Sequence, residues 1–397
     1  MTKVKGLRSV LYYLRRIAVK IRKNLPKQVQ IYVFGMPRGC EKTHVYCSKT
    51  EQTYSVVRKD EKERRQPPET PEAAVHWKFC QDKRMIYHHP DVWLAQISNA
   101  LIVGQDAHVI TDTQTLLTDA SIQFGLKDEY KNHVLFEGYA KLPKQQHIPG
   151  ISAIINGPNA RTYFHWLLDA LPRIGILNQC TYELAKVDTF FIPQNNLPAI
   201  SESLDLLGIS TSRCQELRHN LSFRSEHLLL SSMPGNTGNP PYWAWKFLRD
   251  SFLRLSENVP DIYPQRFFIS RKDTRRLLNE SEIMSALNRR GISVIQPEKL
   301  SFIEQVALFA RAELVVAPHG AALANLVFSP KTTSVVELFS PNYVNVCFWT
   351  IANLGGLRYS YLEGEGERPA EYFDPHLARE DILISPEKLE LWLNSWL

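Results

Sequence analysis

The sequence of 397 residues is poor in long apolar runs and in cysteine. No stretch approaches the about 18 to 20 apolar residues that a helix needs to cross a bilayer. The N-terminus shows no apolar segment followed by a small-residue cleavage site, so no secretory signal is expected. The six cysteines are scattered and form no C-x-x-C pair. This spacing argues against a disulfide framework or a zinc knuckle and fits a reducing compartment.

Motifs of several common enzyme classes are also missing. The sequence contains no G-x-S-x-G, no G-x-x-x-x-G-K-[ST], no H-E-x-x-H and no G-x-G-x-x-G. It contains no D-x-D either, so the usual carboxylate pair for a metal that bridges a nucleoside diphosphate is absent. We therefore expect neither a metal site nor a bound cofactor.

Positive charge is confined to one end of the chain. The sequence has 47 Lys and Arg against 41 Asp and Glu, and ten of those cations lie in residues 1–40, which contain no acid. The remaining residues hold 37 basic and 41 acidic side chains, a net charge of −4. This distribution argues against nucleic acid as a partner of the body of the protein.

The basic end has the pattern of an amphipathic helix. Its apolar residues recur at steps of three and four, which places them on one helix face: Leu7, Val10, Leu11, Leu14, Ile17, Ala18 and Ile21. A helix of this kind over residues 1–24 fits peripheral contact with an anionic membrane. Docking of the same helix on its own domain, with the basic face in water, is an equally acceptable interpretation at this point.

Length and composition predict two packed domains. Apolar residues make up 44% of the chain and charged residues 22%, which is ordinary for a globular protein. The Gly-, Pro- and Asn-rich stretch 231–241 is the best candidate for an interdomain linker, and the charged, proline-containing run 58–74 is predicted to be a surface loop. The predicted division is a basic segment 1–40, an α/β domain 41–240, a second α/β domain 241–375 and a C-terminal helix 376–397.

Strands and helices alternate most clearly after residue 265. The apolar runs 266–270, 292–296, 314–318 and 334–339 are predicted strands, and 281–291, 301–312 and 320–328 are predicted helices. Such alternation predicts a parallel, doubly wound sheet. In such sheets ligands bind beyond the carboxyl ends of the strands.

Three groups of residues follow those strand ends. His319, Gly320 and Ala321 run from the third strand into a helix start, where small residues and free N–H groups suit a phosphate. Arg271 leaves the first strand, where a guanidinium can grip a phosphate with two hydrogen bonds. Arg275 and Arg276 follow it, one toward the site and the other toward water. Glu337, within an otherwise apolar strand, is placed to accept ribose hydroxyls.

The N-terminal half offers one candidate pair for acid–base chemistry. His165 and Asp169 are four residues apart in TYFHWLLDALPRI, so they share a helix face among aromatic and aliphatic neighbours. Partly desolvated titratable groups at hydrogen-bond spacing are what a general base requires. A structural contact between the two side chains is the competing interpretation.

Taken in order, TYFHWLLDALPRI, FFISRKDTRRLLNESE and VVAPHGAALANLVFSP with VVELF resemble glycosyltransferase family 61. The resemblance covers roughly residues 150–345. It implies a GT-B-like fold of two Rossmann-like, doubly wound domains that face each other across a cleft, with inverting and metal-independent chemistry. It also implies a nucleotide-sugar donor held by Arg271, Arg275, His319, Gly320, Ala321, Asn325 and Glu337.

The acceptor side would then belong to the N-terminal domain. Asp169 is the first choice of base and His165 the second, or the two act as an oriented pair. The acceptor would be a glycan or a lipid-linked sugar, and the absence of a visible signal favours a cytoplasmic, bacterial type of enzyme that builds surface polysaccharide. A sugar-nucleotide epimerase and a catalytically silent scaffold member are the alternatives that the sequence leaves open.

Overall fold

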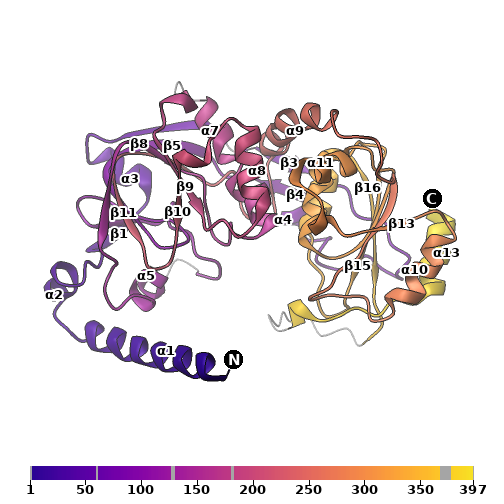
Figure 1. Cartoon of the computed structure of the whole chain (residues 1–397), viewed down its shortest axis with the longest axis horizontal. Helices are drawn as coiled ribbons and strands as arrows, with labels where there is room; N and C mark the ends of the chain where they lie inside the picture. The colour runs from indigo at the N-terminus through magenta and orange to yellow at the C-terminus, as the bar shows by residue number, and fades with distance from the viewer. Residues whose placement is uncertain (1, 60, 127–129, 180–182, 367–376, 397) are drawn as a thin grey trace.

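The computed structural model describes residues 2–59, 61–126, 130–179, 183–366 and 377–396. The described residues form a mixed α/β protein with a nine-stranded sheet, a five-stranded sheet and a small two-stranded sheet. Figure 1 shows the first two sheets in separate halves of the molecule, side by side, with the N-terminal helix below the first half.

The nine-stranded sheet belongs to the N-terminal half and is mixed. Its order is β1-β7-β6-β5-β11-β8-β9-β10, and β2 also pairs with β5. The strands are β1 (Gly39–Glu41), β2 (Thr53–Arg58), β5 (Val92–Val103), β6 (His108–Ile110), β7 (Thr115–Leu117), β8 (Gln145–Ile154), β9 (Thr189–Pro193), β10 (Cys214–Leu217) and β11 (Ser222–Ser231).

Strand direction in this sheet corrects the expectation of two doubly wound parallel domains. β11, β8, β9 and β10 are parallel, but β5 is antiparallel to β2, β6 and β11. The short connection between β5 and β6 allows only a hairpin, because parallel neighbours need a long crossover. Only part of the sheet is therefore Rossmann-like.

Helices, one of them long and the others short, accompany this half. They are α1 (Thr2–Lys23), α2 (Lys27–Tyr32), α3 (Thr43–Ser48), α4 (Asp82–Met85), α5 (Val134–Glu137), α6 (Tyr163–His165), α7 (Arg173–Gln179) and α8 (Pro198–Leu206). The two-stranded sheet consists of β3 (Lys62–Arg64) and β4 (Ile86–His88). None of the helices in the described part of the chain is long and apolar enough to span a membrane.

The C-terminal sheet confirms the predicted parallel, doubly wound arrangement. Its order is β13-β12-β14-β15-β16, and every neighbouring pair is parallel. The strands are β12 (Arg266–Ile269), β13 (Ser293–Ile295), β14 (Leu314–Pro318), β15 (Ser334–Phe339) and β16 (Arg358–Glu363). The strand order reverses between β12 and β14, which makes the carboxyl ends of these two strands a switch point for ligand binding.

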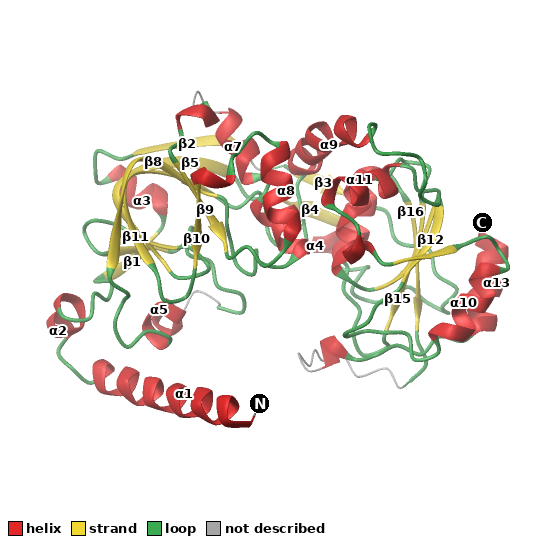
Figure 2. Cartoon of the chain, in the orientation of Figure 1, coloured by secondary structure: helices red, strands yellow, loops and turns green. Residues whose placement is uncertain are grey.

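Helices cover both faces of this sheet (Figure 2). One face packs against α9 (Tyr242–Ser256), α11 (Phe302–Ala310), α12 (Cys347–Gly355) and the 3₁₀ helix Ala321–Phe328, and the other against α10 (Glu280–Asn288) and α13 (Pro386–Trp396). Successive strand residues alternate between the faces. In β15, Val335 and Phe339 point toward α9, α11 and α12, and Glu337 between them has the same orientation.

One apolar cluster joins the two halves. It contains residues of β8 and β9 from the first sheet, residues of β12, β14, β15 and β16 from the second, and the segment 166–177 between them. The run 58–74, predicted to be a surface loop, contains β3 and the buried Arg65, and its Glu69 forms a β-bridge with Ser360 of β16. The predicted boundary at residue 240 stays a prediction, although residues near 65–79 pack on the C-terminal sheet.

A buried histidine in the N-terminal sheet gives the fold a pH dependence. His108 is 3% exposed, and its ring meets the ring of His133 at 4.6 Å. Burial, with smaller effects of His133 and His219, lowers the pKa of His108 to about 3 from 6.5. Below pH 6.5 the unfolded chain therefore binds a proton that the folded protein does not bind, and stability falls as the pH falls toward 3.

We expect the free energy of unfolding to drop by about 1.4 kcal/mol for each pH unit below 6.5 on account of this residue. Urea unfolding at pH 7 and pH 5 measures the drop, and His108→Phe should reduce the difference. The matched control is His147→Asn, because His147 is exposed on β8. An equal pH dependence in wild type and His108→Phe would contradict the prediction.

Candidate functional site

The predicted pair His165 and Asp169 is in direct contact. His165 Nδ1 lies 2.7 Å from Asp169 Oδ2, and Thr237 Oγ1 donates a second hydrogen bond to the same oxygen at 2.9 Å. The Asp169 side chain is 7% exposed and that of His165 is 19% exposed. An ionised carboxylate only accepts, so Nδ1 carries the hydrogen and Nε2 is left as the acceptor nitrogen of the ring.

A local break in the helix places this pair. Residues Trp166–Ala170 form a π-helical turn, closed by the N–H of Leu171 donating to the carbonyl of Trp166 at 2.8 Å. Pro172 has no N–H and its ring crowds the carbonyl four residues earlier, so the helix cannot continue regularly and begins again at Arg173. Single π turns of this kind are frequent at functional sites.

Arg173, which the sequence did not single out, holds this helix to the N-terminal sheet. Arg173 is 3% exposed, and its guanidinium donates to Ser231 Oγ at 2.9 Å, to the Ser231 carbonyl at 2.7 Å and to the Asn156 carbonyl. Burial lowers its pKa to about 9. Arg173 therefore holds the ends of β8 and β11 together. The loop that carries Thr237 follows β11.

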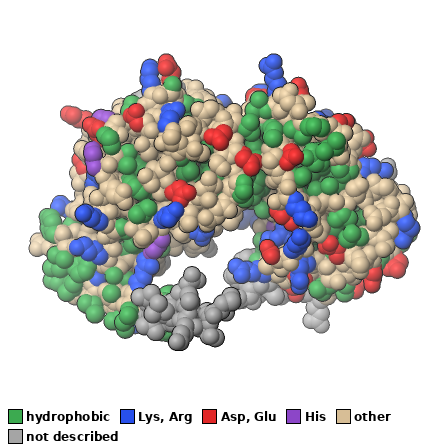
Figure 3. Space-filling model, in the orientation of Figure 1, with side chains coloured by type: hydrophobic (Ala, Val, Ile, Leu, Met, Phe, Trp, Pro, Cys, Tyr) green, Lys and Arg blue, Asp and Glu red, His purple; other side chains and the backbone are tan. Residues whose placement is uncertain are grey.

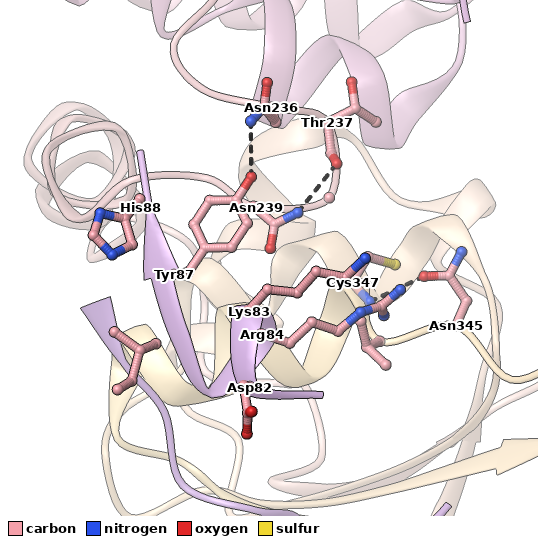
Figure 4. A pocket seen from close by; sticks show the side chains of 13 residues that line it. Asp82, Lys83, Arg84, Tyr87, His88, Asn236, Thr237, Asn239, Asn345 and Cys347 are labelled. Atoms are coloured by element: carbon pink, nitrogen blue, oxygen red, sulfur yellow. Dashed lines mark hydrogen bonds between the residues drawn. The ribbon is translucent and has the colours of Figure 1, made fainter. Parts of the chain in front are cut away.

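That loop, predicted to be an interdomain linker, also forms a wall of a pocket beside the pair. The pocket has a volume of about 820 Å³ and lies between α4 and β4, residues 236–239 and residues 345–347. Figure 4 shows Lys83 and Arg84 of α4 projecting into it, opposite the loop. Thr237 both lines the pocket and donates to Asp169, so this one residue links the pocket to the His165–Asp169 pair.

A second, smaller pocket lies at the switch point of the C-terminal sheet. It has a volume of about 270 Å³ and is lined by residues that follow β12, β13 and β14, including Arg271 and Ala321, and by Tyr163 of the N-terminal half. A Cβ placed on Gly320 would lie only 1.6 Å from Arg271 Nη1, so the guanidinium rests directly on this glycine. The predicted turn and the predicted arginine are therefore in contact.

The positive charge of this region is concentrated. Burial and repulsion by Arg275 lower the pKa of Arg271 to about 10. Arg275 stacks on the Tyr343 ring at 5.8 Å, and its Nε has no hydrogen-bond partner among the described residues. Arg276, by contrast, pairs with Asp381 at 2.5 Å on the surface. Of the two arginines it is Arg275 that turns toward the predicted site.

His319 and Glu337 form a buried pair with Tyr359. His319 Nδ1 shares a hydrogen bond with one carboxylate oxygen of Glu337, and Tyr359 donates to the other. Burial raises the pKa of Glu337 well above its ordinary value; burial, with Arg275 and Arg271, lowers the pKa of His319. His319 is therefore neutral at neutral pH, and burial favours the protonated, neutral form of Glu337.

This arrangement differs from the expected contact of Glu337 with a ribose. Its side chain is fully buried, and both carboxylate oxygens already have protein partners. Because side chains alternate along β15, Glu337 points into the cluster under α12 and not out of the strand end. In this structure Glu337 orients His319.

Direct contacts bring the two predicted groups together across the junction of the halves. Tyr163 Oη donates to Asn325 Oδ1 at 2.5 Å, and Asn325 Nδ2 donates to Gln305 Oε1 at 3.0 Å. Phe164, next to His165, meets the Phe348 ring at 5.7 Å, and Phe348 meets His319 at 5.0 Å. Figure 3 shows a hollow between the two halves with Lys and Arg side chains at its edges.

This assembly coincides with a region known from other proteins. Residues 163–336 match the family described as Glycosyltransferase 61. They begin at Tyr163, include both members of the His165–Asp169 pair, and end one residue before Glu337. We call the matched residues 163–336 the glycosyltransferase 61 domain.

The chain is also similar to transferases of plants and animals. A β-1,2-xylosyltransferase of Oryza sativa subsp. japonica is 30% identical over 194 residues, which are 44% of this chain and 32% of that protein. An EGF domain-specific O-linked N-acetylglucosamine transferase of Drosophila melanogaster is 29% identical over 114 residues, 26% of this chain and 22% of its own length.

A third relative is a protein O-linked-mannose β-1,4-N-acetylglucosaminyltransferase 2 of Bos taurus, 33% identical over 107 residues, 25% of this chain and 18% of that protein. The chain thus spans about a third or less of the length of these curated relatives. The resemblance to the glycosyltransferase 61 family is confirmed.

Several residues of the glycosyltransferase 61 domain and its surroundings had no visible signal in the sequence. Thr237 is predicted only as part of a loop, and Arg84 lies more than 150 positions before the loop with which it lines a pocket. Tyr163 and Asn325 are joined only by the tertiary fold. Among the described residues no group of three or more His, Cys, Asp or Glu side chains is placed to hold a metal ion.

Proposed function

We propose that the protein is a glycosyltransferase that moves a sugar from a nucleotide-sugar donor to a glycan or lipid-linked acceptor. The observation that carries the proposal is that Tyr163 and Phe164, which directly precede a His–Asp pair, contact residues beside a basic strand-end site within the matched residues 163–336. The His–Asp pair can accept the proton of the acceptor hydroxyl, and the basic site suits the diphosphate that leaves. Glycosyl transfer requires both functions, and these two sites are neighbours.

The donor is proposed to bind on the C-terminal sheet. Its nucleotide would enter the pocket beyond β12 and β14, and its diphosphate would lie against Arg271, Arg275 and the start of the helix Ala321–Phe328. His319, kept neutral by burial and oriented by Glu337, would donate a hydrogen bond to the diphosphate or the sugar. No metal and no other cofactor is required, since these cations neutralise the leaving group.

The acceptor is proposed to reach the site through the larger pocket at Thr237. His165 Nε2 would take the proton of the acceptor hydroxyl, and Asp169 would hold the ring and stabilise the imidazolium that forms. The hydroxyl oxygen then bonds to the anomeric carbon while the bond from that carbon to the phosphate oxygen breaks. The diphosphate leaves with the electron pair, and a single displacement inverts the configuration.

A GT-B-like pairing of the halves, a role in surface polysaccharide synthesis and a cytoplasmic place of action complete the proposal. The support for the first is the meeting of the two predicted groups at the junction. The support for work beside a membrane is the basic helix α1.

A panel of nucleotide-sugars, assayed for nucleoside diphosphate release with and without sugar acceptors, tests the function. We expect release that depends on the acceptor and that persists in excess EDTA, because arginines and helix N–H groups carry the diphosphate charge. Loss of activity in EDTA and its recovery with magnesium or manganese would overturn the metal-free mechanism. Conversion of the donor without acceptor would indicate an epimerase, and no turnover with any donor would indicate a scaffold.

A further inference from the structure

Helix α1 rests on the body of the protein by an unexpected face. Val19 and Arg22 are buried, and the Arg15 guanidinium lies over the Tyr139 ring at 5.4 Å. Leu14, Ile17 and Ile21 are instead more than half exposed. Because these three recur at steps of three and four residues, they form one continuous apolar stripe directed to solvent.

The surroundings of this stripe define the chemistry of its partner. Arg16, Lys20 and Lys23 are exposed on the same helix, and residues 1–40 contain no acid. Tyr13 is 65% exposed beside the stripe. Figure 3 shows hydrophobic side chains gathered over the region of α1 and α2. An apolar stripe flanked by cations and an aromatic side chain is complementary to the headgroup region of an anionic bilayer.

A cavity of about 1030 Å³ lies where α1 ends and α2 begins. Four cations line it: Arg22, Lys23, Lys27 and Arg38. Arg22 is 1% exposed, and its Nε is buried without a hydrogen-bond partner among the described residues.

The cavity holds more positive charge than its protein partners neutralise. The other nitrogens of Arg22 donate to Gln30 Oε1 at 3.3 Å and to the Phe136 carbonyl. Glu137 pairs with Lys23, and Arg38 donates to Gln114 and Tyr32, neither of which is charged. Burial lowers the pKa of Arg22, and Glu137 only partly opposes this. A buried cation with an unused donor is satisfied by a bound anion.

We propose that this cavity binds the phosphate of an anionic phospholipid headgroup while Leu14, Ile17 and Ile21 enter the membrane interface. Arg22 and Lys23 directly follow Ile21, so one lipid can reach both features. Two guanidinium and two ammonium groups suit a phosphate better than the carboxylate of a sugar acid, because they offer many donors around a tetrahedral anion. The proposal does not depend on the transferase activity.

Flotation of the full-length protein with vesicles tests the proposal. Wild type should float with vesicles of phosphatidylcholine plus phosphatidylglycerol and not with phosphatidylcholine alone. Lys27→Ala combined with Arg38→Ala should weaken binding about 30-fold, as expected for two charges at a membrane surface. Ile17→Ser combined with Ile21→Ser should also release the protein, because the apolar stripe is lost.

The matched control is Arg254→Ala combined with Lys331→Ala, which removes the same two kinds of charge from exposed positions in the C-terminal half. Equal weakening by the control would mean general charge attraction and would overturn the cavity site. A second measurement uses glycerol 3-phosphate and the protein without vesicles. Tight binding of this compound that leaves flotation unchanged would assign the cavity to a free phosphate and overturn the proposal of a lipid headgroup. Thermal unfolding of each variant verifies that the fold persists.

Discussion

Replacing His165 with alanine is expected to lower kcat by at least about 10²-fold, because positioned proton transfer contributes about 10² to 10⁴-fold to catalysis. Affinity for the nucleoside diphosphate should stay close to that of the wild type, since the rings of Phe164 and Phe348 lie between His165 and His319 of the proposed donor site. Initial rates at saturating donor and calorimetry of diphosphate binding measure the two quantities separately.

Asp169→Asn should produce a loss of similar depth if the two residues act as a unit. The amide keeps the shape of the side chain but no longer fixes the hydrogen on His165 Nδ1 or stabilises an imidazolium. Asp250→Asn, on the exposed surface of α9, is the matched control. Suppose instead that the Asp169→Asn enzyme retains more than about a tenth of the wild-type rate. Its loss of activity would then be much smaller than the contribution of a positioned proton transfer, and the pair would be removed from the mechanism.

Arg271→Ala is expected to weaken nucleoside diphosphate binding by about 1.5 to 3 kcal/mol, the range for hydrogen bonds to charged groups. This corresponds to a Kd about 10 to 150 times higher. The reason is that Arg271 lies in the strand-end pocket and rests on Gly320. Isothermal titration with the diphosphate measures the effect, and turnover at saturating donor should fall less than affinity.

Two further variants make the donor prediction specific. Arg276→Ala removes a neighbouring arginine whose partner is Asp381, so diphosphate affinity should not change. Gly320→Ala keeps every charge but forces the Arg271 guanidinium aside, and the extended backbone at Gly320 (φ −176°) accepts an alanine without strain. Unchanged affinity in a folded Arg271→Ala protein would exclude this arginine from the donor site.

The C-terminal half could be predicted from sequence because its interactions are local in the chain. Each strand from β12 to β15 is followed by the helix that covers it, so alternating elements are sufficient to indicate a parallel sheet. The spacing of His165 and Asp169 likewise predicts their contact, because four residues span one helical turn. Elements α12 and β16 were not anticipated, since the run from Cys347 to Glu363 is apolar without a clear period.

Pairings between distant segments could not be read in this way. β5 pairs with β2, β6 and β11, and nothing local in Val92–Val103 specifies those partners or their directions. The sequence predicts that Glu337 meets a ligand, because its strand ends at the edge of the sheet where ligands bind. Whether its side chain reaches that ligand depends on the face of the sheet to which it points, and the tertiary structure sets that face. The hydrogen bond from Thr237 to Asp169 joins residues that are 68 positions apart in the chain, and no short sequence motif spans that distance.

The walls of the pocket at Thr237 come partly from within the matched residues 163–336 and partly from outside them. Its loop 236–239 lies within the glycosyltransferase 61 domain, whereas Lys83, Arg84 and the rest of the segment 82–88 lie outside the matched residues 163–336. If acceptors bind there as proposed, the segment 82–88 contributes to acceptor recognition and contributes nothing to the His165–Asp169 pair or to the strand-end arginines. Exchange of this segment between homologous chains should therefore transfer acceptor preference without transferring donor preference.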